Sequence, residues 1–308
     1  GTSVGVALFP QHASNGEELI ANADMAMYQA KAAGKNTWRI YRLDQNIARE
    51  MVDRWSWKER IQQALDNNLL QLHFQGIFHT SDRRLSHLEV LVRMRDEQDP
   101  DKLIPPSQFI PVAEKTGKIL DIDRWIIRES IKLLATSEGI PSLSVNISGR
   151  SFDEPSLPTY IAEQLRHYGV APQRLYVEVT ETAAVSDMRD AQRFIEALRE
   201  TGCKVCLDDF GTGFSSFTYL KHLKAEVLKI DGMFVRDLLK DQDSQIFVRG
   251  MVSMAHSMGK QTVAEFVESQ EVLDMLQEFG VDMVQGYYLD RPRADHPALY
   301  GQASLEGF

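Results

Sequence analysis

The chain has 308 residues, of which 43% are hydrophobic and 25% charged, and its formal net charge at pH 7 is −10. This length allows one large α/β domain or two smaller ones. The negative charge argues against a nucleic-acid polymer as partner, because such binding relies on clustered Lys and Arg that neutralise phosphates. The sequence lacks a run of about 18 apolar residues and a charged-then-apolar leader, so we expect a cytoplasmic fragment.

The first 44 residues are expected to form a strand and a helix that cannot bury a core alone. The chain opens inside the apolar run "SVGVALFP", which suggests a piece of a longer protein with upstream domains and leaves a membrane anchor in that parent open. Helical spacing of apolar residues after residue 15 predicts a helix that closes on Gly34. Its sequence "ADMAMYQAKAAGKN" resembles the tail of a GGDEF (diguanylate cyclase) domain, without that domain's catalytic turn. We therefore expect a GGDEF remnant plus linker over residues 1–44 and a linker helix over 45–55.

Residues 56–300 alternate short apolar strands with amphipathic helices. The expected strands read "LQLHFQGIF", "HLEVLVRM", "LSVNIS", "RLYVEVTE", "KVCLDDFG", "VLKIDG", "QTVAEFVE" and "DMVQGYY". This pattern predicts an α/β fold of the TIM-like (β/α)8 barrel type. The turn "HTSDRR" between the first two strands is too short for a parallel crossover, so one of these strands should be antiparallel. Cys203 and Cys206 form one CxxC pair, which we interpret as core packing, with a redox role as the alternative.

Polar residues accumulate at the ends of seven expected strands, where a barrel carries its chemistry. Asp208 and Asp209 are adjacent, and two carboxylates about 4 Å apart repel by roughly 4 kcal/mol at an effective dielectric of 20, so a cation is expected beside them. Oxygen ligands without His or Cys favour magnesium or manganese. The candidates are Glu89, Asn146, Glu178, Asp208, Asp209, Lys229, Glu265 and Gln285.

The same stretches resemble the EAL family of phosphodiesterases, which open cyclic di-GMP to linear pGpG. The resemblance covers about residues 56–295. The motifs that carry it are "EVLVR" for EALLR, "NIS" for NLS, "EVTE" for EITE, "DDFGTGFSSFTYL" for DDFGTGYSSLSYL, "KIDGMF" for KIDxxF, "EFVE" for EGVE and "QGYYLDRP" for QGYLFGRP.

This resemblance implies two divalent cations, Mg²⁺ or Mn²⁺, and cyclic di-GMP as the ligand. It places the first cation on Glu89, Asn146, Glu178 and Asp208, and the second on Asp208, Asp209 and Glu265. Glu265, Lys229 and Asp209 would act in catalysis, with Lys229 orienting the attacking water, and Glu181 would anchor the "GTGFSS" loop. Substrate contacts would come from Gln75, Leu91, Arg93 and Gln285, the last also supporting the metal site. The family also pairs near that loop, which implies a homodimer.

Three departures from the family pattern are Gly76 for proline, Val90 for alanine and Phe266 for glycine. Strand alternation predicts that Val90 and Phe266 point away from the metals, toward the helices. One alternative reading is a catalytically inactive receptor for cyclic di-GMP that signals to a partner. Another is a barrel that abstracts protons using Lys229 and one metal. The intact acid set and the "DDFGTG" loop favour the hydrolase.

Overall fold

The computed structural model describes residues 2–32, 36–41, 45–97, 99, 102–213 and 217–301. The chain divides into two compact units, Gly1–Trp57 and Lys58–Phe308. Within the described residues, no helix combines the length and the apolar character needed to cross a bilayer.

The first unit pairs two short parallel strands beside a helix. Strand β1 (Val4–Val6) pairs with β2 (Trp38–Ile40), and helix α1 (Gly16–Ala32) lies between them in sequence. A Cβ on Gly5 would lie 2.0 Å from the carbonyl oxygen of Ala23, so the close approach of strand and helix requires glycine there. The predicted helix is present, although its expected end at Gly34 lies outside the described residues. Helix α2 (Gln45–Asp66) then continues across the division at Trp57.

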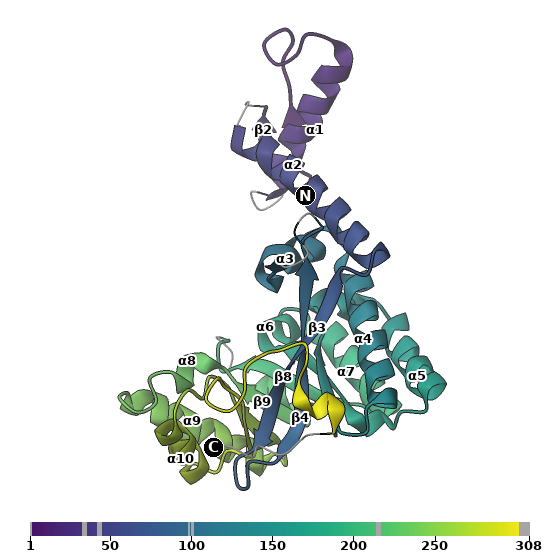
Figure 1. The fold of residues 1–308 in the computed structure, drawn as a ribbon. Coiled ribbons are helices and arrows are strands. Elements are labelled where there is room, and N and C mark those ends of the chain that lie inside the picture. The colour runs from purple at the N-terminus through teal and green to yellow at the C-terminus, as the bar shows by residue number, and fades with distance from the viewer. Residues whose placement is uncertain are drawn as a thin grey trace. The chain divides into compact units, whose positions relative to one another are not determined.

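The second unit is a closed barrel of eight strands, as the sequence predicted (Figure 1). Strand β3 closes it by pairing antiparallel with both β4 and β11, so β3 is the expected antiparallel strand. The remaining neighbours in the barrel are parallel, and β5 (Leu103–Ile104) adds to the edge of β4. The barrel strands are β3 (Leu70–His79), β4 (Leu85–Arg95), β6 (Leu143–Asn146), β7 (Leu175–Thr180), β8 (Lys204–Phe210), β9 (Val227–Ile230), β10 (Gln261–Ala264) and β11 (Met283–Val284).

Helices surround the barrel, with α4, α5 and α7 on one side of the strands and α8, α9 and α10 on the other (Figure 1). Glycines in the left-handed conformation end α3, α5 and α7, since glycine adopts this conformation without steric cost. The α-helices of this unit after α2 are α3 (Pro106–Thr116), α4 (Ile119–Thr136), α5 (Ser156–Tyr168), α6 (Glu181–Ser186), α7 (Met188–Thr201), α8 (Gly232–Val235), α9 (Gln242–Ser257) and α10 (Gln270–Glu278). Short 3₁₀ turns cover η1 (Gly149–Asp153), η2 (Pro172–Arg174), η3 (Phe217–Lys221) and η4 (Pro297–Tyr300).

A mostly apolar layer inside the barrel supports the polar layer above it. Its members are Ile77, Tyr176, Cys206, Val227, Val263 and Met283, all of them buried. Residues two positions apart on a strand share a face, so the next layer toward the carboxyl ends of the parallel strands is formed by polar side chains. Cys203 and Cys206 are both buried and free, which agrees with a packing role, and burial raises the pKa of both thiols.

Candidate active site

Lys229 on β9 lies at the centre of the polar layer, with its side chain 1% exposed. Its Nζ lies 2.9 Å from Glu178 Oε2 and 2.9 Å from Glu265 Oε1. Asp208 Oδ1 follows at 3.2 Å and Glu89 Oε2 at 3.5 Å. Burial alone would lower the pKa of the Lys229 ammonium, but the four carboxylates raise it well above its ordinary value. Lys229 is therefore a fixed cation that joins acids from four other barrel positions.

The carboxylates around Lys229 differ in how well they are compensated. Burial raises the pKa of Glu178 and of Glu265 above the ordinary range, although Lys229 acts in the opposite direction. Burial would also raise the pKa of Glu89, yet Lys229, Gln285 and Asn146 together bring it below the ordinary value. Such a dense set of acids is suited to bind cations, which would relieve the remaining repulsion.

A chain of amides fixes the orientation of Glu89. Asn146 Nδ2 donates to Glu89 Oε1 at 2.8 Å, and Gln285 Nε2 donates to Glu89 Oε2 at 2.6 Å. Gln285 Nε2 also lies 3.1 Å from Gln75 Oε1, which brings a third amide to the same place. These residues come from β3, β4 and β6 and from the residue after β11, so barrel closure assembles the group.

Asp208 and Asp209 both reach the barrel mouth, although they are adjacent in sequence. The pairing of β8 with β9 shifts register between Leu207 and Phe210, and Asp209 has a φ of 54°. This left-handed conformation breaks the strand alternation that would send neighbouring side chains to opposite faces. Carboxylate oxygens of Asp208, Asp209 and Glu265 lie within 4.8 Å of one another. Burial, followed by the charges of Asp208 and Asp231, raises the pKa of Asp209.

The donor set fits a divalent cation on two grounds. The first is this group of three carboxylates, whose hard oxygens are the ligands that magnesium and manganese prefer. The second is Glu178 Oε1, which is buried and has no hydrogen-bond partner among the described residues. A buried carboxylate oxygen without a donor is costly unless something else binds it.

Glu181 is separate from this cluster and holds the loop that follows β8. It begins α6, directly after β7, and does not lie on a strand face. Its Oε2 accepts the Gly211 N–H at 2.7 Å, and its Oε1 accepts the Tyr219 hydroxyl at 2.6 Å. A Cβ on Gly213 would lie 2.7 Å from Glu181 Oε1, so a larger residue at this position would displace the Glu181 carboxylate. Residues 214–216 of the expected "GTGFSS" loop lie outside the described residues.

A pocket of about 260 Å³ opens beside the acids. Arg93 shares the inner face of β4 with Glu89 and Leu91, and its Nη1 donates to the carbonyl of Val92 at 2.9 Å. Arg93 is not among the residues that line the pocket. The lining residues are Gln75, Glu89, Leu91, Glu265, Phe266, Glu268, Gln285, Gly286 and Tyr287.

Comparison with known proteins agrees with this arrangement. The EAL domain family matches residues 58–292, which is most of the chain. The chain belongs to the EAL domain family. The diguanylate cyclase GGDEF domain family matches residues 1–37, within the first unit.

Curated relatives match this chain over part of their longer sequences. Signaling protein YkoW of Bacillus subtilis is 35% identical over 294 residues, covering 94% of this chain and 36% of that protein. Cyclic di-GMP phosphodiesterase PdeB of Shewanella oneidensis is 35% identical over 300 residues, covering 95% of this chain and 34% of that protein. The chain thus spans about a third of the length of these relatives.

Solved structures share the EAL fold. The PaMucR phosphodiesterase in complex with c-di-GMP matches with a TM-score of 0.73 and 32% identity, over 78% of this chain and 98% of that one. The FimX EAL domain from Pseudomonas aeruginosa bound to c-di-GMP matches with a TM-score of 0.72 and 32% identity, over 77% and 96%.

One prediction about the EAL site is wrong. Phe266 was expected to point toward the helices, yet it lines the pocket, is 42% exposed and has a φ of 56°. Strand β10 ends at Ala264, so alternation no longer applies two residues later. The Arg236 guanidinium lies 4.1 Å from the centre of the Phe266 ring, a cation–π contact. Val90, in contrast, is buried on the face of β4 opposite Glu89, as predicted.

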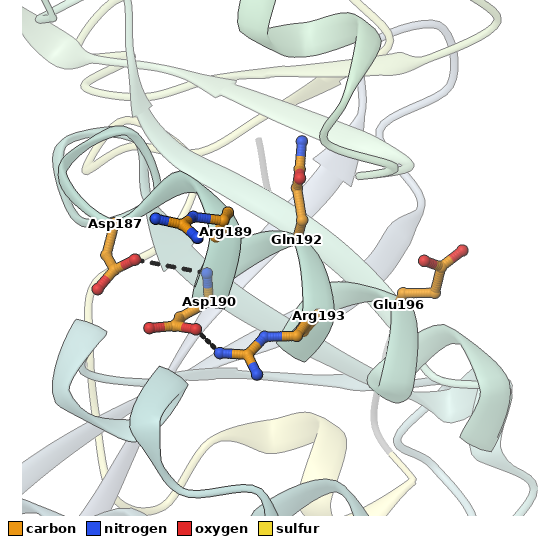
Figure 2. A pocket seen from close by; sticks show the side chains of 6 residues that line it. All are labelled: Asp187, Arg189, Asp190, Gln192, Arg193 and Glu196. Carbon is orange, nitrogen blue, oxygen red and sulfur yellow. Dashed lines mark hydrogen bonds and ion pairs between the residues drawn. The ribbon is translucent and has the colours of Figure 1, made fainter.

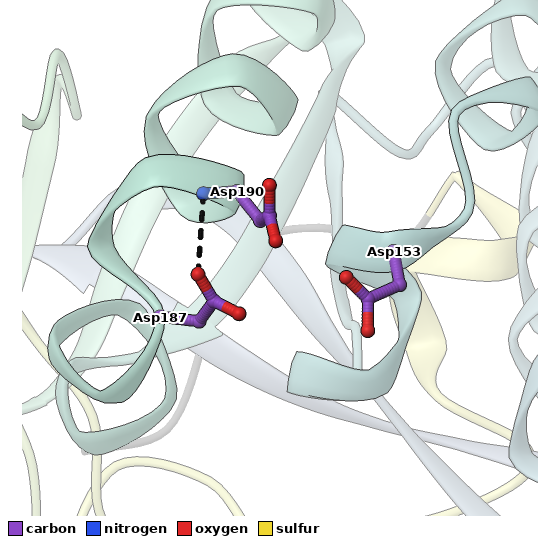
Figure 3. Close-up of side chains that lie close together, drawn as sticks. All are labelled: Asp153, Asp187 and Asp190. Atoms are coloured by element: carbon purple, nitrogen blue, oxygen red, sulfur yellow. Dashed lines mark hydrogen bonds between the residues drawn. The ribbon is translucent and has the colours of Figure 1, made fainter.

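A second acidic group of the EAL domain, Asp153, Asp187 and Asp190, has an ordinary structural explanation. Asp187 accepts the Asp190 N–H and caps α7, while Asp153 faces them from η1 (Figure 3). Asp190 also forms an ion pair with Arg193, beside an open surface hollow of about 740 Å³ (Figure 2). None of the residues that line this hollow belongs to the cluster around Lys229.

Proposed function

We propose that this EAL domain is a metal-dependent phosphodiesterase that hydrolyses cyclic di-GMP to linear pGpG. The observation that carries the proposal is the set of acids around Lys229, with the pocket of Gln75, Leu91 and Gln285 beside it. Relatives named cyclic di-GMP phosphodiesterases, together with neighbours solved in complex with c-di-GMP, support this substrate.

Two cations, Mg²⁺ or Mn²⁺, are proposed to bind at the mouth of the barrel. Glu89, Asn146, Glu178 and Asp208 would hold one, and Asp208, Asp209 and Glu265 the other. When bound, such a pair supplies an activated water and stabilises the negative charge that develops on the phosphate. The proximity of the Asp208, Asp209 and Glu265 oxygens and the unpaired Glu178 Oε1 support this assignment.

Individual residues of the chain would have separate roles in catalysis and substrate binding. Lys229 would orient the attacking water, whose oxygen bonds to phosphorus while one P–O ester bond breaks and the leaving ribose oxygen takes a proton. Glu265, with Asp209 beside it, would accept one proton from that water, and this proton would return through solvent to the leaving ribose oxygen. Glu181 would hold the loop, while the amides of Gln75 and Gln285 position the dinucleotide. Leu91 would contact a base, and Arg93 would approach a phosphate from the rim of β4.

The wider organisation is also a proposal. Residues 1–44 would be the end of a GGDEF domain with its linker, 45–55 a linker helix and 56–300 the phosphodiesterase. The matches to residues 1–37 and 58–292 and the division after Trp57 support this reading. We further propose that the domain forms a homodimer near the loop after β8, and that it belongs to a longer parent chain with upstream domains, which the greater length of the matched relatives supports.

Chromatography of cyclic di-GMP incubated with the protein tests the function. Linear pGpG should appear with magnesium or manganese and not with EDTA, and Glu265→Gln should abolish its formation. Tight binding of intact cyclic di-GMP without hydrolysis under all metal conditions would indicate the inactive receptor instead.

A further inference from the structure

One edge of strand β3 has a gap in its backbone pairing, next to the pocket. Strand β11 pairs with β3 at His79 and Phe78, and an antiparallel bridge joins Phe74 to Arg293. Gly76 lies between these two points. Alternate residues of an antiparallel strand present their N–H groups to the same neighbour, so the Gly76 N–H points to this edge. None of the strands in the described part of the chain supplies an acceptor for this N–H.

The carboxylate of Asp290 fills this gap. Its Oδ2 accepts the Gly76 N–H at 2.7 Å and the His296 Nε2–H at 2.9 Å, and its Oδ1 accepts from Arg293 Nη2 at 2.5 Å. His296 Nδ1 accepts the Ala298 N–H at 3.2 Å, which leaves the ring proton on Nε2. Burial would raise the pKa of Asp290, but these donors lower it below the ordinary value. Asp290 is thus a buried anion with three donors.

The same residue also holds the side chain of Gln75. The main-chain carbonyl of Asp290 accepts from Gln75 Nε2 at 3.0 Å. Gln75 Oε1 accepts from Gln285 Nε2, which in turn donates to Glu89 Oε2. Gln75 and Gln285 are 7% and 4% exposed, so neither amide is free to turn into solvent. A continuous path of hydrogen bonds therefore runs from Asp290 through both amides to Glu89.

We propose that Asp290 is the positioning residue for Gln75. Its carboxylate holds the backbone N–H of the next residue, Gly76, and its main-chain carbonyl holds the side-chain amide of Gln75. This inference rests on the proposed function, in which Gln75 contacts the dinucleotide. The EAL pattern has a proline where this chain has Gly76, and a proline has no N–H that needs an acceptor. Here the flexible glycine keeps its N–H, and the buried carboxylate of Asp290 fixes it.

A double-mutant cycle tests the coupling through binding of cyclic di-GMP, measured by calorimetry with calcium in place of magnesium. Asp290→Ala removes the carboxylate that accepts the Gly76 N–H and keeps the main-chain carbonyl that accepts from Gln75. The backbone next to Gln75 should therefore loosen, and binding should weaken about tenfold. Adding Asp290→Ala to Gln75→Ala should cause no further loss, since the Asp290 carboxylate affects the ligand only through the position of Gln75. Asp295→Ala is the matched control, because Asp295 is an exposed acid of the same segment and should change binding less than twofold. Additive losses, or unchanged binding in Asp290→Ala, would overturn the proposal.

Hydrogen exchange of the Gly76 amide gives a readout that needs no ligand. Asp290→Ala should speed exchange at Gly76 at least tenfold while amides of the inner strands remain protected, and Asp295→Ala should leave it unchanged. Unchanged exchange at Gly76 would show that Asp290 does not hold this N–H. If Asp290→Ala does not fold, Asp290→Ser makes the same test, because its hydroxyl is too short to reach Gly76. Failure of the wild-type protein to bind cyclic di-GMP would overturn the proposed function, while the exchange measurement still decides the role of Asp290.

Discussion

Replacing Lys229 with methionine should make the stability of the barrel depend on pH and on divalent metal. The ammonium lies between 2.9 and 3.5 Å from carboxylate oxygens of Glu89, Glu178, Asp208 and Glu265. Each such pair is worth roughly 5 kcal/mol at an effective dielectric of 20, before desolvation is subtracted. Removing one partner of a buried ion pair typically costs about 3–5 kcal/mol, because the other charge is left uncompensated. We expect a loss of this size in the free energy of unfolding at pH 8 in EDTA.

The loss should shrink on acidification and on addition of metal. Without Lys229 the carboxylates have folded-state pKa values above their unfolded values, so the folded state binds more protons. Stability therefore rises as the pH falls from 8 toward 5. Magnesium or manganese would replace the missing positive charge, so either ion should raise the melting temperature of Lys229→Met more than that of the wild-type protein.

Chemical and thermal unfolding, with and without metal, measure both effects. Lys260→Met is the matched control, because Lys260 is also buried but donates to the carbonyl oxygens of Leu223 and Ala225. The loss in the free energy of unfolding that Lys260→Met causes should be similar at pH 5 and pH 8 and should not change when metal is added. The reasoning is refuted if Lys229→Met is as stable as the wild-type protein at pH 8, or if neither acid nor metal relieves its instability.

Four further substitutions, one of them tested through the pH dependence of stability, probe other parts of the EAL domain. Glu265→Gln should lower turnover at least about a thousandfold, some 4 kcal/mol, while calorimetry with calcium shows affinity for cyclic di-GMP falling less than about tenfold. Val90→Ala should leave turnover within a few fold of the wild-type rate, because Val90 faces away from Glu89. A hundredfold loss in a steady-state assay would show that Val90 faces the acids instead. Glu181→Ala should weaken magnesium affinity and turnover together while the protein stays folded. Unchanged magnesium dependence would show that Glu181 does not act on the site by holding the loop after β8. Burial raises the pKa of Asp123 to about 7, so between pH 5 and pH 8 the folded state binds more protons than the unfolded state. Stability should therefore fall as the pH rises from 5 to 8. Asp123→Asn should flatten this slope in urea unfolding, and an equally steep slope would argue against that raised pKa.

Much of the barrel was predictable because each strand alternates and ends in a polar residue. Alternation on β4, β7 and β9 placed Glu89, Glu178 and Lys229 on inner faces, and the short turn after β3 required an antiparallel pair. The family resemblance then indicated which of these residues belong together. The distances around Lys229 were not predictable, because they depend on how eight strands close and tilt, which no local pattern specifies.

The rest of the site lies where local periodicity stops. Asp290 and His296 come after the last strand, in a segment without helical or strand spacing, so only the folded chain brings them to Gly76. Tyr287 and Glu268 line the pocket from loops for the same reason. Phe266 was misassigned because the expected strand was extended to Glu268, four residues past Ala264, the last residue of β10.

The left-handed φ of Asp209 explains how the barrel mouth holds more acids than alternation permits, and Phe266 is a second non-glycine residue with such a φ beside these acids. The left-handed residue Asp209, near the end of β8, brings its own side chain and that of Asp208 to the same side, whereas a regular strand would supply one of them. Such conformations cost about 1–3 kcal/mol each and persist where surrounding contacts hold them. At Phe266 those contacts are the Arg236 guanidinium and Gly232, where a Cβ would lie 2.0 Å from the ring. At the barrel mouth this strain falls on Asp209 and Phe266, and replacing Gly232 would displace the ring next to Glu265.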